Sequence, residues 1–405
     1  MAAARPYHRC VTTPPSPSRA YLAQQLAVAY PDASGRNEDL VFVRAPGRVN
    51  LIGEHTDYNG GFVLPVAIDM DVRIALRPTD EPRVRLTRVD TGAAAEIDLR
   101  AIPPAAGQWH DYVAGTAWAL QEAGQPIHGF DGAIVTTLPI GSGLSSSAAL
   151  EVVSAWALSG PAGPALAPLE LARIAQRAEN GHVGVQCGLM DQFASACGVA
   201  GHALLFDCRS LDWRAVPLPD DLALVVIHSG VSHAHGDNAY NARRAACERV
   251  VAAIARDDSS VTLLRDVDMP RLDAYRDQLD PVDYDRAYHV ITENDRVLAA
   301  VAALEADDHA ALGELMAGSQ ASMRDRYDIT CPEIDELVAI TVDVPGVIGS
   351  RMTGGGFGGC TVSLVRPDAV EALRHRVERD YPGRTGKTPR LWTLQAMGGA
   401  GIVDG

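Results

Sequence analysis

The stretch Leu138-Pro-Ile-Gly-Ser-Gly-Leu-Ser-Ser-Ser-Ala-Ala-Leu-Glu-Val152 joins two different sequence patterns. The apolar run from Ala133 to Leu138 predicts a strand, and the nearly continuous apolar residues through Leu158 predict a buried helix. The glycines between them let backbone N–H groups approach an oxyanion, and the serines add hydroxyl donors. The helix N-terminus adds free N–H groups and partial positive charge. The pattern indicates a phosphate site that needs no lysine; the alternative is that Ser145 to Ser147 only cap a core helix.

An earlier segment, Arg44 to Gly61, is rich in polar residues and is followed by a strand-like run from Phe62 to Ile68. The pairs Pro46-Gly47 and Asn59-Gly60 are turn formers, so we expect the residues between them to lie at a tight reversal of the chain. Two carboxylates and an imidazole within four positions suit a polyhydroxylated ligand such as a sugar, although such a cluster is also common in solvated turns; these residues are Glu54, His55 and Asp57.

Three further charged residues are candidates for a functional role. Arg48 has apolar neighbours, and a guanidinium is seldom buried without an anionic partner, so it forms either a structural ion pair or a binding site. The helix expected from Pro168 to Glu179 ends with a carboxylate that opposes the helix dipole, which invites a compensating cation. Asp191 lies at a second expected helix start, where the simplest interpretation is an N-cap.

The glycine cluster at Gly354 to Gly359 contains the spacing G-x-G-x-x-G. In a dinucleotide-binding fingerprint these glycines must open a helix. The alternating residues Cys360 to Leu364 predict a strand instead, which argues against a nicotinamide-dependent dehydrogenase. We expect the glycines to let the backbone pass close to a ligand or to another loop.

Two other stretches imitate known sites. Gly383 to Thr388 resembles a Walker A loop, but the first glycine of that motif would fall at Tyr381 and Pro389 follows at once, so we expect a surface loop. His233 to Asp237 offers three possible metal ligands, but no further histidine follows at a short spacing, which argues against zinc.

Composition limits the class of protein. The 405 residues are 47% apolar, enough for one large core or two domains. Lys and Arg total 35 against 51 Asp and Glu, a formal charge of -16, which disfavours nucleic acid and anionic membranes as partners. The single lysine, Lys387, excludes most lysine-dependent phosphate loops and Schiff-base mechanisms.

The seven cysteines are scattered and never form a C-x-x-C pair, which predicts reduced thiols in a reducing compartment. No apolar run has the length that a bilayer needs, and the first 19 residues lack the hydrophobic segment of a secretory signal. We therefore expect a cytoplasmic protein.

The order of patterns suggests the domain organisation. Residues 1–19 are rich in Pro and Ser and predict a flexible leader. Strand-like and helix-like segments then alternate to the C-terminus, which indicates an α+β protein. The pattern of apolar residues is interrupted near Asp212 to Asp221, where we expect a domain boundary. The predicted domains are residues 20–216 and 217–405.

Four segments, in their order along the chain, resemble the GHMP kinase superfamily and, within it, the galactokinase family. They are Gly47 to Tyr58, Gly141 to Ala149, the stretch from Pro168 to Phe193, and Gly354 to Gly359. Similar stretches, including Gly201 to Leu211 and Tyr327 to Leu337, extend the resemblance to about residues 20–400. The resemblance implies a two-domain fold with an N-terminal ribosomal-protein-S5-like α/β domain, a C-terminal ferredoxin-like α+β domain and the active site between them.

The resemblance also implies residue roles. Asp191 would be the catalytic carboxylate, acting as a late base or as an orienting acceptor, and Arg48 the cation that faces it. The sugar contacts would be Glu54, His55, Asp57, Gly188 and Tyr240. The ATP phosphates would lie on Gly141, Ser142, Gly143, Leu144, Ser145, Ser146 and Ser147. The Mg²⁺ partners would be Ser147 and Glu179, with Ser146 as the alternative serine.

The implied activity is ATP-dependent phosphorylation of the anomeric hydroxyl of α-D-galactose, which yields galactose 1-phosphate and ADP and commits galactose to the Leloir pathway. The expected partners are galactose, ATP and Mg²⁺, and we expect a monomer. An N-acetylgalactosamine or arabinose 1-kinase is the alternative within the class. A catalytically silent sugar and ATP sensor is the alternative outside it.

Overall fold

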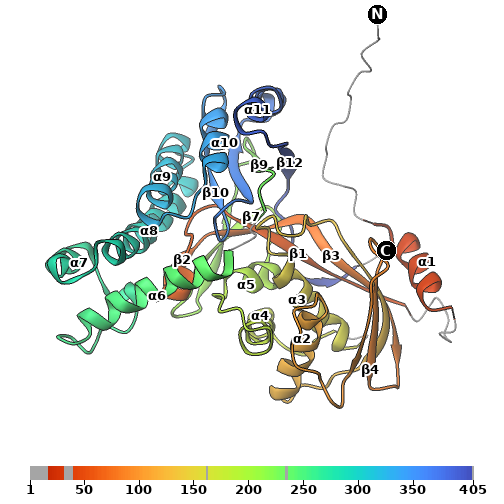
Figure 1. Ribbon diagram of the computed structural model, residues 1–405. Coiled ribbons are helices and arrows are strands. Elements are labelled where there is room, and N and C mark those ends of the chain that lie inside the picture. Colours follow the sequence, from red (N-terminus) through yellow and green to blue (C-terminus); the bar gives the residue numbers. More distant parts are fainter. Residues whose placement is uncertain (1–16, 32–39, 161–162, 233–235, 404–405) are drawn as a thin grey trace, which may run out of the picture.

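The computed structural model describes residues 17–31, 40–160, 163–232 and 236–403. Three β-sheets and the helices around them form its framework (Figure 1). The largest sheet has the order β13-β1-β3-β6-β4-β5, and all its neighbouring strands are antiparallel except the parallel pair β4 and β6. In that order its strands are Gly401–Ile402, Val41–Asn50, Pro65–Thr79, Gly129–Thr136, Arg83–Arg88 and Ala94–Asp98.

Along each strand of this sheet, successive side chains point to opposite faces. Apolar side chains therefore lie on both faces, and helices cover both. Val43 points into the main core, whereas the adjacent Phe42 packs under α1 (Arg19–Ala29) with Leu22 and Leu26. The face of the main core carries four helices, which Figure 1 shows together below the sheet. They are α2 (Asp111–Glu122), α3 (Ser146–Leu158), α4 (Pro168–Ala178) and α5 (Met190–Cys197).

The second sheet follows the same rule. Its order is β10-β11-β9-β12, formed by Val347–Thr353, Cys360–Val365, Ala223–His228 and Arg390–Leu394. On β9, Val225 and Ile227 face α10 (Pro332–Val342) and α11 (Val370–Thr385), while Leu224 and Val226 join the main core. The two larger sheets therefore share one continuous hydrophobic core.

The remaining elements flank this core. A three-stranded sheet, β2-β7-β8, consists of Phe62–Val63, His202–Asp207 and Trp213–Pro217. A separate apolar cluster includes α6 (Gly236–Ile254), α7 (Met269–Ala274) and the long helix α8 (Pro281–Glu305), and α8 also packs against α9 (His309–Ser322). Every helix of the described segments is too short or too polar to cross a membrane.

Several expectations from the sequence are confirmed. Helix α3 follows the glycine and serine loop and ends at Leu158, and strand β11 follows the third glycine cluster. The predicted domain boundary falls between β8 and β9, but β13 returns to pair with β1, so the division into two domains stays a prediction. Of the seven cysteines, six lie in the described part and none of those six forms a disulfide.

Other expectations need correction or fall outside the structure. Gly383 was expected in a surface loop, but α11 continues to Thr385 and Gly386 ends it in a left-handed conformation. The predicted leader lies almost wholly outside the described residues, as do His233 and His235 of the possible zinc cluster.

The expected turn at Pro46-Gly47 is wrong. Both residues belong to strand β1, which continues to Asn50. A bulge between Pro46 and Arg48 shifts the register of β1 against β3. The backbone N–H of Arg48 donates instead to the Leu144 carbonyl, at 3.2 Å. The bulge therefore attaches β1 to the glycine and serine loop. The second expected turn is confirmed, because Asp57–Asn59 form a 3₁₀ turn that Gly60 closes at φ 68°.

We predict that Gly47→Ala destabilises the fold by about 1–3 kcal/mol, the usual cost of overpacking. A Cβ atom on Gly47 would lie 2.4 Å from Cδ2 of Leu138 and 2.6 Å from the Leu144 carbonyl oxygen. Urea unfolding measures the change. Gly401→Ala is the matched control, because a Cβ there meets nothing within 4 Å; equal stability of the two variants would contradict the prediction.

Candidate active site

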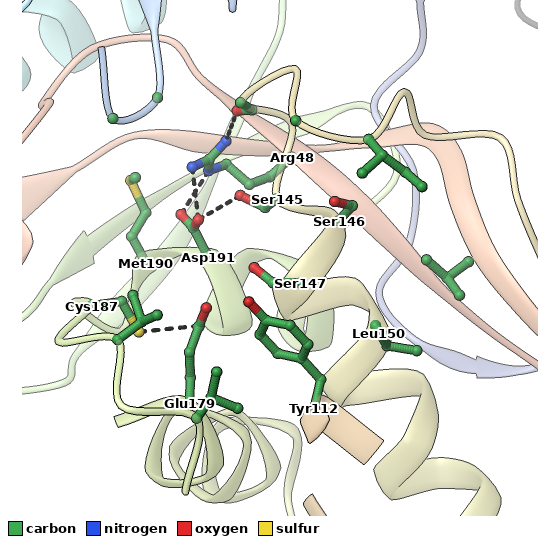
Figure 2. A pocket seen from close by; sticks show the side chains of 18 of the residues that line it. Arg48, Tyr112, Ser145, Ser146, Ser147, Leu150, Glu179, Cys187, Met190 and Asp191 are labelled. Atoms are coloured by element: carbon green, nitrogen blue, oxygen red, sulfur yellow. Dashed lines mark hydrogen bonds and ion pairs between the residues drawn. The ribbon is translucent and has the colours of Figure 1, made fainter. Parts of the chain in front are cut away.

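A buried ion pair lies at the centre of the candidate site. Arg48 of β1 donates two hydrogen bonds to Asp191 of α5, from Nε to Oδ1 at 2.7 Å and from Nη2 to Oδ2 at 2.8 Å (Figure 2). Its third nitrogen donates to the Gly143 carbonyl at 2.6 Å. The Arg48 side chain is 5% exposed and that of Asp191 is 29% exposed, so the carboxylate forms the open side of the pair. The N-cap interpretation of Asp191 is wrong, because Leu189 precedes the helix and the carboxylate binds Arg48.

The pair lies in a cavity of about 760 Å³. Most of the residues singled out in the sequence line it: Arg48, Glu54, His55, Asp57, Gly141, Gly143, Ser145, Ser146, Ser147, Glu179, Gly188, Asp191 and Tyr240. Two others are turned elsewhere. The Ser142 hydroxyl donates to the Pro139 carbonyl at 2.6 Å, and Leu144 packs in the core.

The loop before α3 faces Asp191 directly. Ser145 has the left-handed conformation φ 59°, ψ 48°, unusual for a residue with a side chain. Its hydroxyl makes no capping bond to the helix and donates to Oδ2 of Asp191 at 2.5 Å. The interpretation that the serines only cap a core helix is therefore wrong for Ser145.

The third glycine cluster closes over this loop. Gly354 has φ 90°, and a Cβ atom there would lie 2.9 Å from the Gly143 carbonyl oxygen. The Gly354 N–H donates to Oε1 of Glu54 at 3.1 Å. The expectation that these glycines bring the backbone close to another loop is confirmed.

Asp57 marks the end of the cavity that the early polar segment forms. A Cβ atom on Gly188 would lie 1.7 Å from Oδ2 of Asp57, so only glycine allows this carboxylate its position. Burial, and next the charge of Asp191, raise the pKa of Asp57 to about 6.

His55 lies beside Asp57 as a neutral ring. Its Nδ1 hydrogen-bonds the Tyr58 hydroxyl at 2.7 Å, and its Nε2 donates to the Gly355 carbonyl at 3.2 Å. Burial lowers the pKa of the imidazole to about 3. The Tyr240 ring packs against it with 5.0 Å between centroids, which gives this end one apolar wall beside several hydrogen-bonding groups.

Glu179 occupies the opposite side of Asp191. It begins a π-helical turn, Glu179–Val183, rather than the last turn of α4. Figure 2 shows Ser147, Tyr112 and Glu179 converging on one part of the cavity. Burial raises the pKa of Glu179 to about 7 despite a hydrogen bond from Cys187, and Asp191 adds to the increase.

The far end of the cavity is apolar, and sequence reasoning did not find it. Trp109 and Tyr112 line it together with Val72, Ile134, Ile140, Leu150 and Val183. Arg88 lies over the Trp109 ring at 5.9 Å. Flat aromatic and aliphatic walls suit a planar ring such as a nucleotide base. Apart from Trp109 and Tyr112, which are three positions apart, these residues come from separate segments of the chain, so no local motif marks the wall as a whole.

Known protein families match three parts of the chain. Residues 29–78 match the galactokinase galactose-binding signature, 111–199 the GHMP kinase N-terminal domain and 300–383 the GHMP kinase C-terminal domain. The galactokinase of Roseiflexus sp. (strain RS-1) is 46% identical over 363 residues, which cover 90% of this chain and 93% of that protein. The chain belongs to the galactokinase family.

Solved structures support the family assignment and the fold. The Lactococcus lactis galactokinase, solved with galactose, matches with a TM-score of 0.89 and 32% identity over 94% of this chain and 98% of that chain. A mevalonate kinase matches with a TM-score of 0.62 at 18% identity, covering 88% and 99%. The α+β GHMP kinase fold expected from the resemblance is confirmed.

One buried residue that supports the site, Arg351, was not predicted from the sequence of this galactokinase family member. Arg351 of β10 is fully buried and pairs with Oε2 of Glu54, and it also donates to the Leu51 carbonyl at 3.0 Å. Glu293 of α8 lies 3.6 Å from the same guanidinium and accepts from the Gly53 N–H at 3.0 Å. These contacts hold Glu54 in place, and none of them is visible as a local motif.

The raised pKa of Asp57 predicts a pH dependence of stability. In the unfolded chain this group has its ordinary pKa of 3.8, so the folded protein binds its proton more tightly. Its contribution to the free energy of unfolding therefore falls as pH rises from about 4 to about 6, and the loss persists above that range. Asp57→Asn removes the loss, so the variant should be more stable than the parent at pH 8, with a difference that shrinks toward pH 4.

Urea unfolding of the ligand-free protein across this pH range measures the difference. Asp80→Asn, at an exposed position, is the control and should show no such trend. A variant of Asp57 that is less stable than the parent at pH 8 would contradict the assigned cost of burying this charge.

Proposed function

We propose that this protein transfers the γ-phosphoryl group of ATP to the anomeric hydroxyl of α-D-galactose, giving α-D-galactose 1-phosphate and ADP. The observation that carries the proposal is the Arg48–Asp191 ion pair, which faces both the serine loop and the polar end of one cavity. A sugar hydroxyl beside Asp191 and a phosphate on the loop would then meet at the pair.

Asp191 is the acceptor for the hydroxyl proton. Both of its oxygens already bind Arg48, and Oδ2 also accepts from Ser145, so Oδ1 has the greater capacity for a new hydrogen bond. A sugar hydroxyl is a much weaker acid than a carboxylic acid, so the proton moves late or Asp191 only orients the attacking oxygen. Arg48 stabilises negative charge that develops on the transferred group.

The serine loop binds the phosphates of ATP. Gly141 and Gly143 have positive φ angles of 71° and 80°, which turn successive backbone groups around the loop, and α3 adds its N-terminal N–H groups. Ser145, Ser146 and Ser147 supply hydroxyls along the same wall. The apolar end with Trp109 and Tyr112 takes the base. Catalysis is then mostly positioning and electrostatic stabilisation.

Ser147 and Glu179 are the residues that would hold Mg²⁺. Their hydroxyl and carboxylate are hard oxygen donors, the class that this ion prefers, and Mg²⁺ takes its other ligands from phosphates and water. When bound with ATP, the ion neutralises charge on the terminal phosphates.

The sugar binds among Asp57, Glu54, His55, Gly188 and Tyr240. The carboxylate of Asp57 accepts hydroxyl hydrogen bonds, and the Tyr240 ring covers an apolar face of the sugar. Glu54 is held by Arg351 and by the N–H of Gly354, so it links sugar binding to the glycine cluster.

We predict that Asp191→Asn lowers kcat by about 10²- to 10⁴-fold, the usual contribution of a proton acceptor, and leaves galactose binding nearly unchanged. ADP release coupled to NADH oxidation measures kcat, and calorimetry measures binding. Asp131→Asn is the control, because Asp131 also accepts a bidentate pair, from Arg85, outside the cavity. Full activity of the Asp191 variant would refute the assigned role.

The choice of sugar is tested with the same assay. Galactose should give the highest kcat/KM in a panel that includes N-acetylgalactosamine, arabinose and glucose. A higher kcat/KM for another sugar would show that this sugar, and not galactose, is the preferred substrate. Binding of ATP without turnover of any sugar would contradict the proposed activity.

A further inference from the structure

A buried amide and a second buried carboxylate lie behind Glu179. Gln192 follows Asp191 on α5, and Glu151 lies one helical turn after Ser147 on α3; both are fully buried. Nε2 of Gln192 donates to Oε2 of Glu179 at 2.6 Å and to Oε2 of Glu151 at 3.0 Å. One amide group therefore connects α3, α5 and the π-helical turn that begins at Glu179.

Two neutral donors share one oxygen of the Glu179 carboxylate. Gln192 donates to Oε2, and the Cys187 thiol donates to the same oxygen at 3.2 Å (Figure 2). Two neutral donors thus hold Oε2, and the Ser147 hydroxyl also hydrogen-bonds the carboxylate. With Oε2 occupied, Glu179 would reach a cation in the cavity through Oε1.

The groups that hold Glu179 carry no charge. Neither Glu179 nor Glu151 forms an ion pair with Arg, Lys or His in the part of the chain that the structure describes. A buried arginine would neutralise the carboxylate and compete with a bound cation, whereas an amide satisfies one lone pair and leaves the negative charge in place. Neutral donors at Oε2 therefore orient the Glu179 carboxylate without reducing its attraction for a cation.

We propose that Gln192 is a positioning residue of the metal site. It fixes the Glu179 carboxylate so that one oxygen faces the cation that accompanies the nucleotide, and Glu151 fixes the Gln192 amide from behind. This inference rests on the proposed function, because Glu179 serves there as a metal partner. It also makes one turn of α5 responsible for both the proton acceptor, Asp191, and the orientation of the metal ligand.

The first experiment compares Gln192→Met with the parent protein, using Mn²⁺ in the presence of ADP as the probe. Methionine keeps the approximate volume and removes the donor. Electron paramagnetic resonance should show Mn²⁺ binding that is about 10-fold weaker, since partners of metal ligands usually contribute 10- to 100-fold in affinity. Galactose affinity, measured by calorimetry without nucleotide, should stay within about 2-fold, because a positioning role at the metal does not extend to the sugar.

A matched control separates this effect from general loss of packing. Gln320 is also buried, and its amide bonds Asp335 and the Met352 N–H outside the cavity. Gln320→Met should lower the thermal midpoint and keep the affinity for Mn²⁺. Weakened Mn²⁺ binding in both variants to the same extent would overturn the proposal.

Glu151 supplies a second test that stands if Gln192→Met does not fold. Glu151→Gln retains an oxygen that accepts from Gln192 and should keep Mn²⁺ affinity, whereas Glu151→Leu loses the acceptor and should weaken it several-fold. Parental affinity in Glu151→Leu would overturn the proposal. Because Mn²⁺ binding is read without sugar, failure to phosphorylate galactose would count against the proposed function and not against this inference.

Discussion

The bidentate pair between Arg48 and Asp191 is the constraint on which the other features of the site depend. It joins the C-terminal part of β1 to the first turn of α5, and its two residues are 143 positions apart in the chain. Removing the carboxylate from a buried guanidinium strongly destabilises a fold. The strand and the helix must therefore meet in the one register that keeps the pair together. Because Gly143 and Ser145 also bond to the pair, that register fixes the glycine and serine loop as well.

Close backbone contacts connect the two ends of the cavity. Gly47 leaves room for the Leu144 carbonyl, Gly354 for that of Gly143, and Gly188 for the Asp57 carboxylate. In each case a methyl group would occupy space that another segment needs. The polar end around Asp57 and the glycine and serine loop are therefore packed tightly together, and a shift in one segment must displace its neighbour.

The sequence predicted those parts of the structure that depend on neighbouring residues. The strand, loop and helix around Gly141, and the strand after Gly359, follow from local spacing. The turn expected at Pro46-Gly47 was wrong because proline and glycine occur both in turns and at bulges within a strand. Arg351, Gln192 and the Trp109 wall stayed hidden because their roles come from partners in distant segments. Asp191 showed the same limit: its position suggested a cap, whereas its partners in the fold are Arg48 and Ser145.

The edge position of β13 has a consequence for how the molecule is made. Strand β1, which carries Arg48, pairs on one side with the last described strand: Val43 is opposite Ile402, and Arg44 donates to the Gly398 carbonyl at 2.8 Å. Gly398 is made 354 positions after Arg44. During synthesis β1 therefore remains without this neighbour until the other strands of the two larger sheets and the helices between them have been translated.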